Sequence, residues 1–231
     1  MRGTTERPGA AGAVRARNEG EQAYERLRGE IVSGEFQPNE RLVEADLIQR
    51  LGAGRSAVRT ALVRLEHEGL VEREPNRGAK VRFVDEQEAA EILESRMVLE
   101  GLAARHAAEN VTRAEADELR AILEEMRSCL GVGDLLGASD LNARLHGRLL
   151  EISSHRTVAR LVANLNSQLV RFQYRTILLP GRAEQSHAEH RAIVDAVAAG
   201  DPTAAEQAVR DHLAHVVEAL RAGPSAPTRV L

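Results

Sequence analysis

Helical periodicity that runs from Glu86 almost to the C-terminus is the feature that most constrains how this chain folds. Apolar residues recur there every three or four positions, which is the spacing of helices that bury one face. The pattern predicts six helices, over residues 86–109, 113–130, 135–152, 157–178, 182–199 and 203–221. Helices joined by such short connections pack as a bundle, so we expect an all-helical domain after a boundary near Val84.

The first third of the chain has a different pattern. Glu21–Ser33, Val43–Leu51 and Ser56–Gly69 each have the spacing of a short helix, and Gly52 with Gly54 makes a tight connection between the second and the third. The run LVEREPNRGAKVRFV then alternates apolar and charged residues on both sides of a turn, which indicates a β-hairpin. We therefore predict a mainly α protein, with an N-terminal winged helix-turn-helix, a small β-hairpin wing and a C-terminal helical bundle.

Composition agrees with a globular chain. Of 231 residues, 43% are hydrophobic and 29% are charged, and no apolar run approaches the roughly 18 residues of a membrane span. The first residues lack a secretory hydrophobic segment, and the single cysteine, Cys129, fits a reducing compartment. We expect a cytoplasmic protein with no membrane partner. The predicted division is a flexible tail over 1–19, the winged helix-turn-helix over 20–84, a helical effector-binding, metal-binding and dimerisation domain over 85–222, and a tail over 223–231.

Positive charge gathers in the predicted helix-turn-helix. No acidic residue lies between Asp46 and Glu66, whereas four arginines do: Arg50, Arg55, Arg59 and Arg64. Arg55 and Arg59 are one turn apart at the start of the third helix, where a recognition helix meets base edges, and Ser56 suits a phosphate at the same helix start. Arg77 and Gly78, at the hairpin tip, suit a minor groove. The alternative is a solvated helix face with no DNA contact.

The run from Ala23 to Val81 resembles the DNA-binding domain of GntR-family regulators. Its landmarks are Gly34, Pro38, Leu42, Glu44, Leu47, Arg55, Val58, Arg59, Ala61, Leu62, Leu65, Gly69 and Gly78. The resemblance implies binding to double-stranded operator DNA and adds Glu44 to the candidate DNA-binding residues. Gly54 and Thr60 depart from the family, which usually has Ser or Thr and often Glu at these positions. Because Gly54 has no hydroxyl to cap the recognition helix, operator affinity or preference is expected to differ.

Three of the eight histidines fall in three different predicted helices: His146, His190 and His212. Asn142 lies one turn before His146, so the two side chains share a helix face. Side chains that converge from separate helices form the metal sites of helical bundles. The alternative is a set of hydrogen-bonded structural histidines. His187 and His215 each lie three residues from a candidate, so spacing alone leaves the choice of ligands open.

Residues from Glu86 to Arg221 resemble the FCD ligand-binding domain of the FadR-type GntR branch. The marks are Arg96 and Glu100, the NARLH run that ends at His146, the EHRAIVDAV run that contains His190, and the DHL run around His212. Six helices match the shorter, VanR-like version. The resemblance implies a divalent metal ion, zinc or nickel or a similar ion, held by Asn142, His146, His190 and His212. Asn142 is neutral where many members have Asp, so weaker metal binding is expected.

A metal ion with open coordination positions would attract a carboxylate, which makes a small organic acid the expected effector. Arg96 is the natural second anchor for that acid, although it can also pair with Glu100 four residues away. The most polar patch of the predicted fourth helix could line the cavity too, through Arg171, Tyr174 and Arg175.

These features favour a regulator over an enzyme. We expect a homodimeric repressor that binds a palindromic operator and is released by a small carboxylate. Two alternatives remain open. One is a hydrolase whose histidines hold a catalytic metal ion, although the chain has no HExxH-type pairing to supply a general base. The other is a metal-free regulator whose histidines bind the effector directly.

Overall fold

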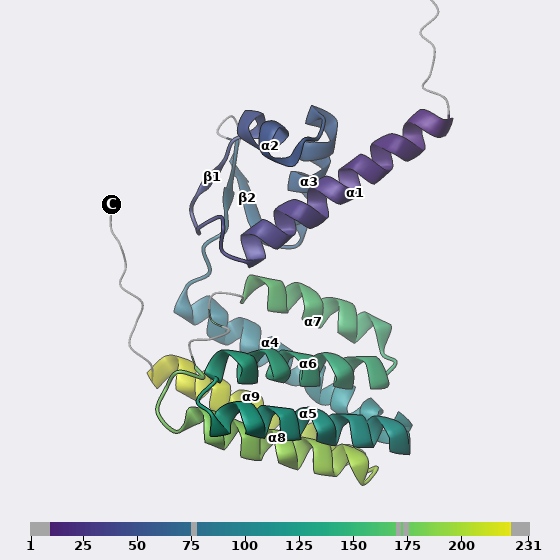
Figure 1. The fold of residues 1–231 in the computed structure, drawn as a ribbon, viewed down its shortest axis with the longest axis vertical. Coiled ribbons are helices and arrows are strands. Elements are labelled where there is room, and N and C mark those ends of the chain that lie inside the picture. Colours follow the sequence, from purple (N-terminus) through teal and green to yellow (C-terminus); the bar gives the residue numbers. More distant parts are fainter. Residues whose placement is uncertain (1–9, 75–77, 170–171, 173–175, 223–231) are drawn as a thin grey trace, which may run out of the picture. The chain divides into compact units, whose positions relative to one another are not determined.

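The computed structural model describes residues 10–74, 78–169, 172 and 176–222 (Figure 1). The chain divides into two compact units, one up to Phe83 and one from Val84. The first unit contains α1 (Ala10–Val32), β1 (Arg41–Leu42), α2 (Glu44–Leu51), α3 (Arg55–His67), β2 (Val71–Glu74) and β3 (Gly78–Val81). The second unit contains α4 (Glu86–Asn110), α5 (Arg113–Gly131), α6 (Leu135–Ile152), α7 (Arg156–Gln168), α8 (Arg182–Ala198) and α9 (Pro202–Ala222).

The first unit is a winged helix-turn-helix. α2 ends at Leu51 and is capped by Gly52, whose φ of 62° lets the chain turn into α3 within a few residues. α1 packs along α3, and the core between the helices and the sheet is formed by Leu27, Leu47, Val58 and Leu65, among others. The three strands have the order β1-β3-β2 and are antiparallel.

Two features of the fold differ from the sequence prediction in the first unit. The sheet has a third strand, β1, which pairs with β3 and which the prediction lacked because a two-residue strand has no readable periodicity. In addition, α1 begins at Ala10, within the segment expected to be a flexible tail. The run AAGAVRARN is rich in alanine and arginine, which favour helix, and no proline interrupts it.

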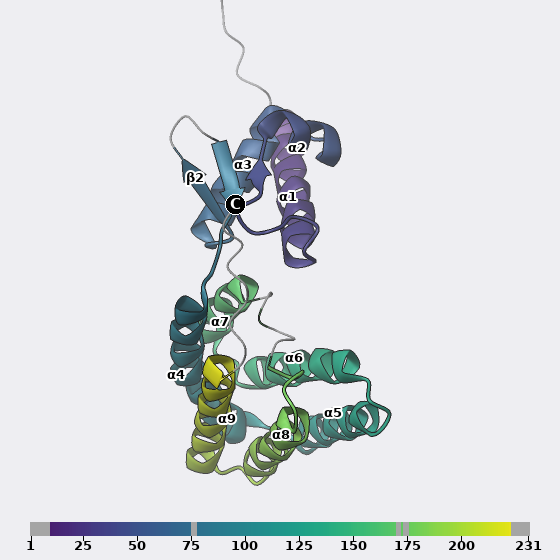
Figure 2. The ribbon, with the colours of Figure 1, turned by 90° about the vertical axis from the view of Figure 1, so that its left-hand side faces the viewer.

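The second unit is a bundle of six helices. α4 lies along α9, α8 packs against α9 and α5, and α5 packs against α6, as Figures 1 and 2 show. Gly101 marks the close approach of α4 to α9, because a Cβ there would lie 3.3 Å from Arg210 side-chain atoms. The core contains Leu119, Ile122, Leu145, Ile193 and Leu213. It therefore lies between the helices that carry the candidate metal ligands.

One helix of the bundle is shorter than predicted. α7 ends at Gln168, whereas the pattern predicted a helix over residues 157–178. Within the described residues that follow, Thr176 to Gly181 form turns. Pro180 disfavours helical backbone at the residue before it, which explains why the helix does not include this segment. Nothing in the sequence at Leu169 signals the earlier end.

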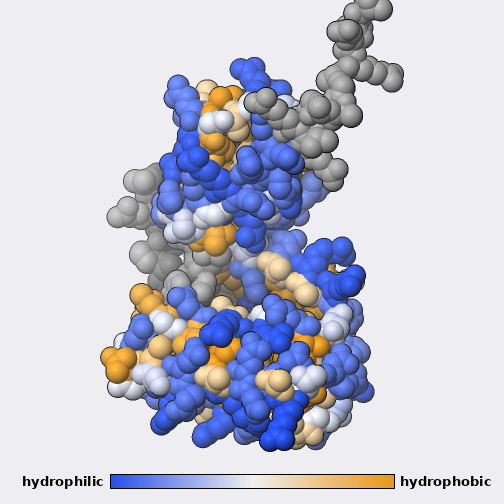
Figure 3. Space-filling model, turned by 45° about the vertical axis from the view of Figure 1, so that its right-hand side comes forward, coloured by the Kyte–Doolittle hydropathy of each residue, from blue (hydrophilic) through white to orange (hydrophobic). Residues whose placement is uncertain are grey.

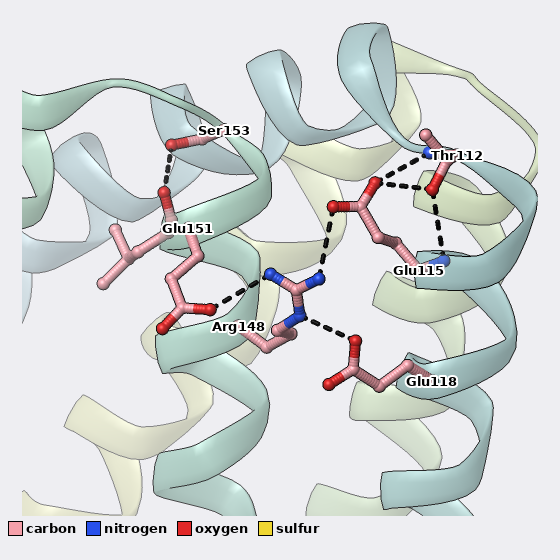
Figure 4. A network of polar contacts seen from close by, with 7 residues as sticks. Thr112, Glu115, Glu118, Arg148, Glu151 and Ser153 are labelled. Carbon is pink, nitrogen blue, oxygen red and sulfur yellow. Dashed lines mark hydrogen bonds and ion pairs between the residues drawn. The ribbon is translucent and has the colours of Figure 1, made fainter.

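A network of ion pairs holds α6 against α5 (Figure 4). Arg148 of α6 donates to Glu115 at 3.2 Å and to Glu118 at 2.8 Å, both on α5, and to Glu151 at 3.0 Å. The carboxylate of Glu115 also accepts from the backbone and side chain of Thr112, which closes the capping box at the start of α5. The network fixes the helix that carries Asn142 and His146.

The surface is mostly hydrophilic on the face drawn in Figure 3, with separate hydrophobic patches. Exposed apolar side chains include Val98, Leu136 and Leu161. Within the described part of the chain, we find no helix with the length and apolar character needed to cross a membrane.

Candidate metal centre and DNA-binding surface

Three buried histidines from three helices meet inside the bundle. His146 of α6, His190 of α8 and His212 of α9 are 6%, 0% and 2% exposed. Each offers a ring nitrogen, and these nitrogens lie within 4.8 Å of one another. Each histidine is adjacent to, or three residues from, a core residue of its own helix: Leu145, Ile193 and Leu213. The packing of the core therefore brings the three rings together.

Two glutamates determine which nitrogens face the centre. Oε2 of Glu100 lies 2.7 Å from Nδ1 of His146, and Oε2 of Glu189 lies 2.7 Å from Nδ1 of His212. A carboxylate only accepts, so each Nδ1 carries the proton and each Nε2 keeps a lone pair. Carboxylate–histidine pairs of this kind orient metal-binding imidazoles in proteins.

The spacing of the nitrogens fits a metal ion. Nε2 of His146 and Nε2 of His190 are 3.3 Å apart. Two nitrogens that share a zinc ion at about 2.0–2.1 Å each are separated by about 3.0–3.4 Å, depending on geometry. Nδ1 of His190 is buried and has no hydrogen-bond partner among the described residues, so no neighbour commits this ring to a different role. The three buried histidines can thus hold a divalent ion.

The electrostatics favour neutral imidazoles. Burial lowers the pKa of His190 well below its usual value, and the neighbouring His212 and His146 lower it further. Burial also lowers the pKa of His212, with contributions from His146 and Arg182. Neutral imidazole is the form that binds metal. By contrast, burial alone would raise the pKa of Glu100, but Arg96 and His146 outweigh it and hold that pKa below its ordinary value.

A cavity of about 200 Å³ adjoins the histidines. Its polar lining includes the candidate ligands Asn142, His146, His190 and His212, together with Arg96 and Arg182. Its apolar lining includes Leu93, Met126, Leu169, Phe172 and Leu213. Nε of Arg96 donates to Glu100 at 2.6 Å, so the intrahelical pair is formed and the arginine also lines the cavity. Arg171, Tyr174 and Arg175 lie outside the described residues.

The remaining histidines have other contacts. Nε2 of His187 lies 3.2 Å from the carbonyl oxygen of Leu123, and Nδ1 of His215 lies 2.9 Å from Oε1 of Glu189. Neither belongs to the group of three. Packing therefore groups His146, His190 and His212 and gives His187 and His215 other contacts.

Sequence reasoning missed the roles of Glu100, Glu189 and Arg182. The sequence indicated Glu100 only as a mark of the resemblance and a partner of Arg96, and Glu189 only as the residue before His190 in the EHRAIVDAV run. Glu189 in fact lies against His212 of α9 and accepts from Nη2 of Arg182 at 2.9 Å. The only sequence signal is spacing, because Arg182 and Glu189 are seven residues apart and share a helix face.

In the first unit, α3 presents a polar exposed surface at its N-terminal half. Arg55, Ser56, Arg59, Thr60 and Val63 line a shallow depression there. Nε of Arg59 lies 3.0 and 3.1 Å from the two carboxylate oxygens of Glu44 on α2, which orients that guanidinium. Arg55 has no hydrogen-bond or ion-pair partner among the described residues. This surface brings together four of the candidate DNA-binding residues: Glu44, Arg55, Ser56 and Arg59.

The other candidate arginines lie in contacts within the unit. Arg50 bonds Glu30 at 2.8 Å and Glu35 at 2.6 Å, and its guanidinium lies over the Phe36 ring. Arg64 bonds Glu21 at 2.6 Å and lies over the Tyr24 ring. Both link their own helix to α1 or to the segment that follows it, so the structure does not group them with Arg55. Gly78 begins β3 with a φ of 86°, and Arg77 lies outside the described residues.

Known families match both units. The model of the bacterial regulatory proteins of the gntR family matches residues 19–81, and the FCD domain model matches residues 91–215, which is more than half of the chain. The chain belongs to the GntR family. It is a transcription regulator with an FCD domain, as its sequence resemblance predicted, and its winged helix-turn-helix and helical bundle confirm the predicted fold class.

Relatives with curated descriptions are similar along most of their length. The uncharacterized HTH-type transcriptional regulator YdhC of Bacillus subtilis is 30% identical over 203 residues, which cover 87% of this chain and 90% of YdhC. A probable D-xylose utilization operon transcriptional repressor of Paenarthrobacter nicotinovorans is 29% identical, with 80% and 81% covered. The repressor RspR of Escherichia coli is 26% identical, with 87% and 88% covered.

Solved structures share the fold of this GntR-family chain. Escherichia coli McbR/YncC superimposes with a TM-score of 0.71 at 21% identity, over 88% of this chain and 97% of McbR/YncC. A GntR regulator from Rhodococcus sp. RHA1 superimposes with a TM-score of 0.66 at 23% identity, over 90% and 100%. At these identities the similarity establishes the fold alone.

Proposed function

We propose that this protein is a repressor that binds a palindromic operator as a homodimer and is released by a small organic acid bound in the FCD domain. The observation that carries the proposal is the exposed N-terminal half of α3, where Arg55, Ser56 and Arg59 lie on one surface in a helix-turn-helix. The opposite face of α3 buries Val58 and Leu65 in the core, so the helix is fixed with this surface outward.

Each residue of this surface has a distinct role in the proposal. Arg55, which has no protein partner among the described residues, would bond guanine or phosphate. Arg59, oriented by Glu44, would reach a second position one turn along the groove. Ser56 lies in the first turn of α3, where backbone N–H groups and its hydroxyl suit a phosphate. Gly78, and Arg77 beside it, would contact the minor groove from the wing.

Two-fold symmetry follows from this mode of reading. One helix-turn-helix binds one half-site, and two copies related by a two-fold axis bind two half-sites about one helical turn of DNA, or a multiple of it, apart. Several relatives carry the name of repressor, which fits a dimer that blocks transcription from its operator. In this proposal the protein acts in the cytoplasm, where the DNA of a bacterium lies.

The effector would occupy the cavity beside the histidines. Asn142, His146, His190 and His212 would hold a divalent ion such as zinc or nickel, and the bound ion would supply a positive centre that attracts an anionic oxygen. Arg96 is paired with Glu100 and Arg182 with Glu189, so the net charge of the polar lining comes mainly from that ion. A cavity of about 200 Å³ is smaller than the roughly 300–1,000 Å³ of sites for drug-sized ligands, which favours an acid of a few carbon atoms.

The hydrolase alternative has less support. A hydrolytic metal centre needs a general base directed at the reacting water. The two carboxylates nearest the histidines, Glu100 and Glu189, are instead bonded to imidazole Nδ1 atoms and to arginines. We therefore propose that the protein is not an enzyme.

In the metal-free alternative the histidines bond the acid directly. Elemental analysis of the purified protein separates a regulator that holds a metal ion from one that does not.

The test is a gel shift on the DNA that flanks the gene, at stated salt, with and without zinc and a panel of small carboxylates. The expected result is a specific shift that one class of acid reverses. Size-exclusion chromatography with light scattering should give twice the chain mass of 25.2 kDa. A protein that binds no DNA specifically under any of these conditions would overturn the proposal.

A further inference from the structure

Arg182, the first residue of α8, is a buried cation whose hydrogen bonds are incomplete. Its side chain is 6% exposed, and the residue lines the cavity beside the histidines. Nη2 donates to Glu189 at 2.9 Å, whereas Nη1 is buried without a hydrogen-bond partner in the described residues. A buried charged donor with no acceptor is unfavourable, and native structures rarely keep one without a purpose.

The incomplete groups are concentrated at this cavity. Only three buried side-chain atoms in the described residues lack a partner: Nη1 of Arg182, Nδ1 of His190 and Oδ1 of Asn164. Arg182 and His190 both line the cavity. Arg96, the arginine that sequence reasoning favoured, differs because its Nε bonds a carboxylate from its own helix and none of its nitrogens is buried without a partner. Of the two arginines that line the cavity, Arg182 is therefore the one with a buried donor that lacks an acceptor.

We propose that Arg182 is the residue that recognises a second acidic group on the effector, and that the effector is a short diacid. This inference rests on the proposed function and deepens it. One carboxylate of the diacid would lie at the histidine centre, and the other would accept from Nη1 of Arg182 and from the second N–H of Nη2, whose first N–H is bonded to Glu189. A guanidinium binds a carboxylate with two donors in a fixed fork, so it discriminates a diacid from a monoacid of similar length. The small cavity restricts the diacid to a few carbon atoms.

Glu189 links this anchor to the histidines. Its Oε2 accepts from Arg182 at 2.9 Å and from Nδ1 of His212 at 2.7 Å, while Oε1 accepts from His215 at 2.9 Å. A carboxylate that arrives at Arg182 competes with Glu189 for the same guanidinium. The orientation of His212 then depends on whether the acid is bound. Arg182 thus connects recognition of the acid with the geometry of the metal centre.

The experiment compares malonate with acetate on the zinc-loaded full chain by isothermal titration calorimetry. The wild type is expected to bind malonate at least about tenfold more tightly than acetate, because one charge-assisted fork contributes about that factor. Arg182→Gln should remove most of this difference, and Arg182→Lys should restore part of it, because the ammonium keeps the charge but loses the fork. Arg221→Gln, at an exposed arginine paired with Glu94, is the matched control and should keep the wild-type ratio.

Two results would overturn the inference: a malonate-to-acetate ratio unchanged in Arg182→Gln, or a wild type that does not distinguish the two acids. If Arg182→Gln does not fold, Arg182→Lys is compared with the wild type instead, since lysine keeps a cation opposite Glu189. A smaller malonate-to-acetate ratio than in the wild type supports the inference, and an unchanged ratio contradicts it. The gel shift of the metal-free protein tests the proposed function separately. If the protein discriminates the acids through Arg182 but binds no operator, the diacid site is supported and the proposed function as a regulator is contradicted.

Discussion

Nδ1 of His146 donates a 2.7 Å hydrogen bond to Oε2 of Glu100, and both side chains are buried. The other oxygen of Glu100 accepts from Arg96 at 2.6 Å. Arg96, Glu100 and His146 thus form a chain of hydrogen bonds from α4 to α6, which ends at the Nε2 of His146 that faces His190. The arginine neutralises the carboxylate, and the carboxylate fixes the imidazole tautomer.

Replacing Glu100 by Gln should weaken zinc binding about 10- to 100-fold, the usual effect of losing a partner behind a ligating histidine. The amide keeps the shape of the side chain, but it has no charge to hold the proton on Nδ1. Competition with a zinc indicator dye measures the change. Glu109→Gln is the control, because Glu109 lies 2.9 Å from Nδ1 of His106, a half-buried histidine outside the group of three. Equal zinc affinity of the Glu100 variant and the wild type would show that the hydrogen bonds from Arg96 through Glu100 to His146 do not contribute to metal binding.

Asn142→Asp should raise zinc affinity on the order of tenfold. Asn142 lines the cavity on the same helix as His146, one turn earlier, and a carboxylate is a stronger ligand for divalent ions than an amide oxygen. The same dye competition measures it, with Asn166→Asp as the control at another cavity-lining amide. If both variants gain equally, general negative charge explains the effect and Asn142 is not a ligand.

The sequence predicted most of the fold because helix ends are encoded locally. The helix expected over residues 135–152 has those bounds in the structure, and the start of α5 follows from Thr112 and Glu115, three residues apart, which form a capping box. The two-residue β1 was missed because its existence depends on pairing with β3, which is distant in sequence. The end of α7 was placed too late because apolar spacing continues beyond it.

The candidate site was predictable in part, because the position of each histidine within its own helix is encoded locally. Three histidines on three helices indicated a shared centre, but spacing could not exclude His187 or His215, whose partners come from other helices. The contact of Glu189 with His212 joins α8 to α9, and that of Glu100 with His146 joins α4 to α6. Such contacts are properties of the packed bundle. No pattern within one helix encodes them.

Stability of the metal-free protein should fall as pH decreases below about 6.5. Burial first, and then the neighbouring charges, lower the pKa of His190 and His212 in the fold, whereas an unfolded histidine titrates near 6.5. The unfolded chain therefore binds more protons, and acid favours unfolding. Between pH 6.5 and 5.5 each histidine should lower the free energy of unfolding by roughly 1 kcal/mol if it stays neutral in the fold.

Urea denaturation with a chelator present, at several pH values, measures this dependence. His190→Phe removes one of the two histidines and should reduce the slope by about half. His67→Gln, at a histidine outside the bundle core, should leave the slope unchanged. A flat profile for the wild type over this range would mean that the buried histidines keep ordinary pKa values.

Arg55→Ala and Arg59→Ala should each weaken operator binding by about 1–3 kcal/mol, measured by gel shift or fluorescence anisotropy. The two should differ in character. Arg55 has no partner among the described residues, so its loss removes a DNA contact and nothing within the protein. Loss of Arg59 also leaves Glu44 unpaired near the phosphates, which adds repulsion.

The double variant Glu44→Gln, Arg59→Ala separates these two effects, because it should recover the part of the loss that comes from repulsion. Arg120→Ala, an exposed arginine of α5 paired with Asp117, is the control and should bind the operator as the wild type does. If the removed arginine contacts a phosphate, the slope of the logarithm of the binding constant against the logarithm of salt concentration should decrease by about one. If it contacts a base, the preference of the protein for one operator sequence should change instead. Unchanged operator binding by both single variants, with dimers intact, would show that α3 does not read the DNA through this surface.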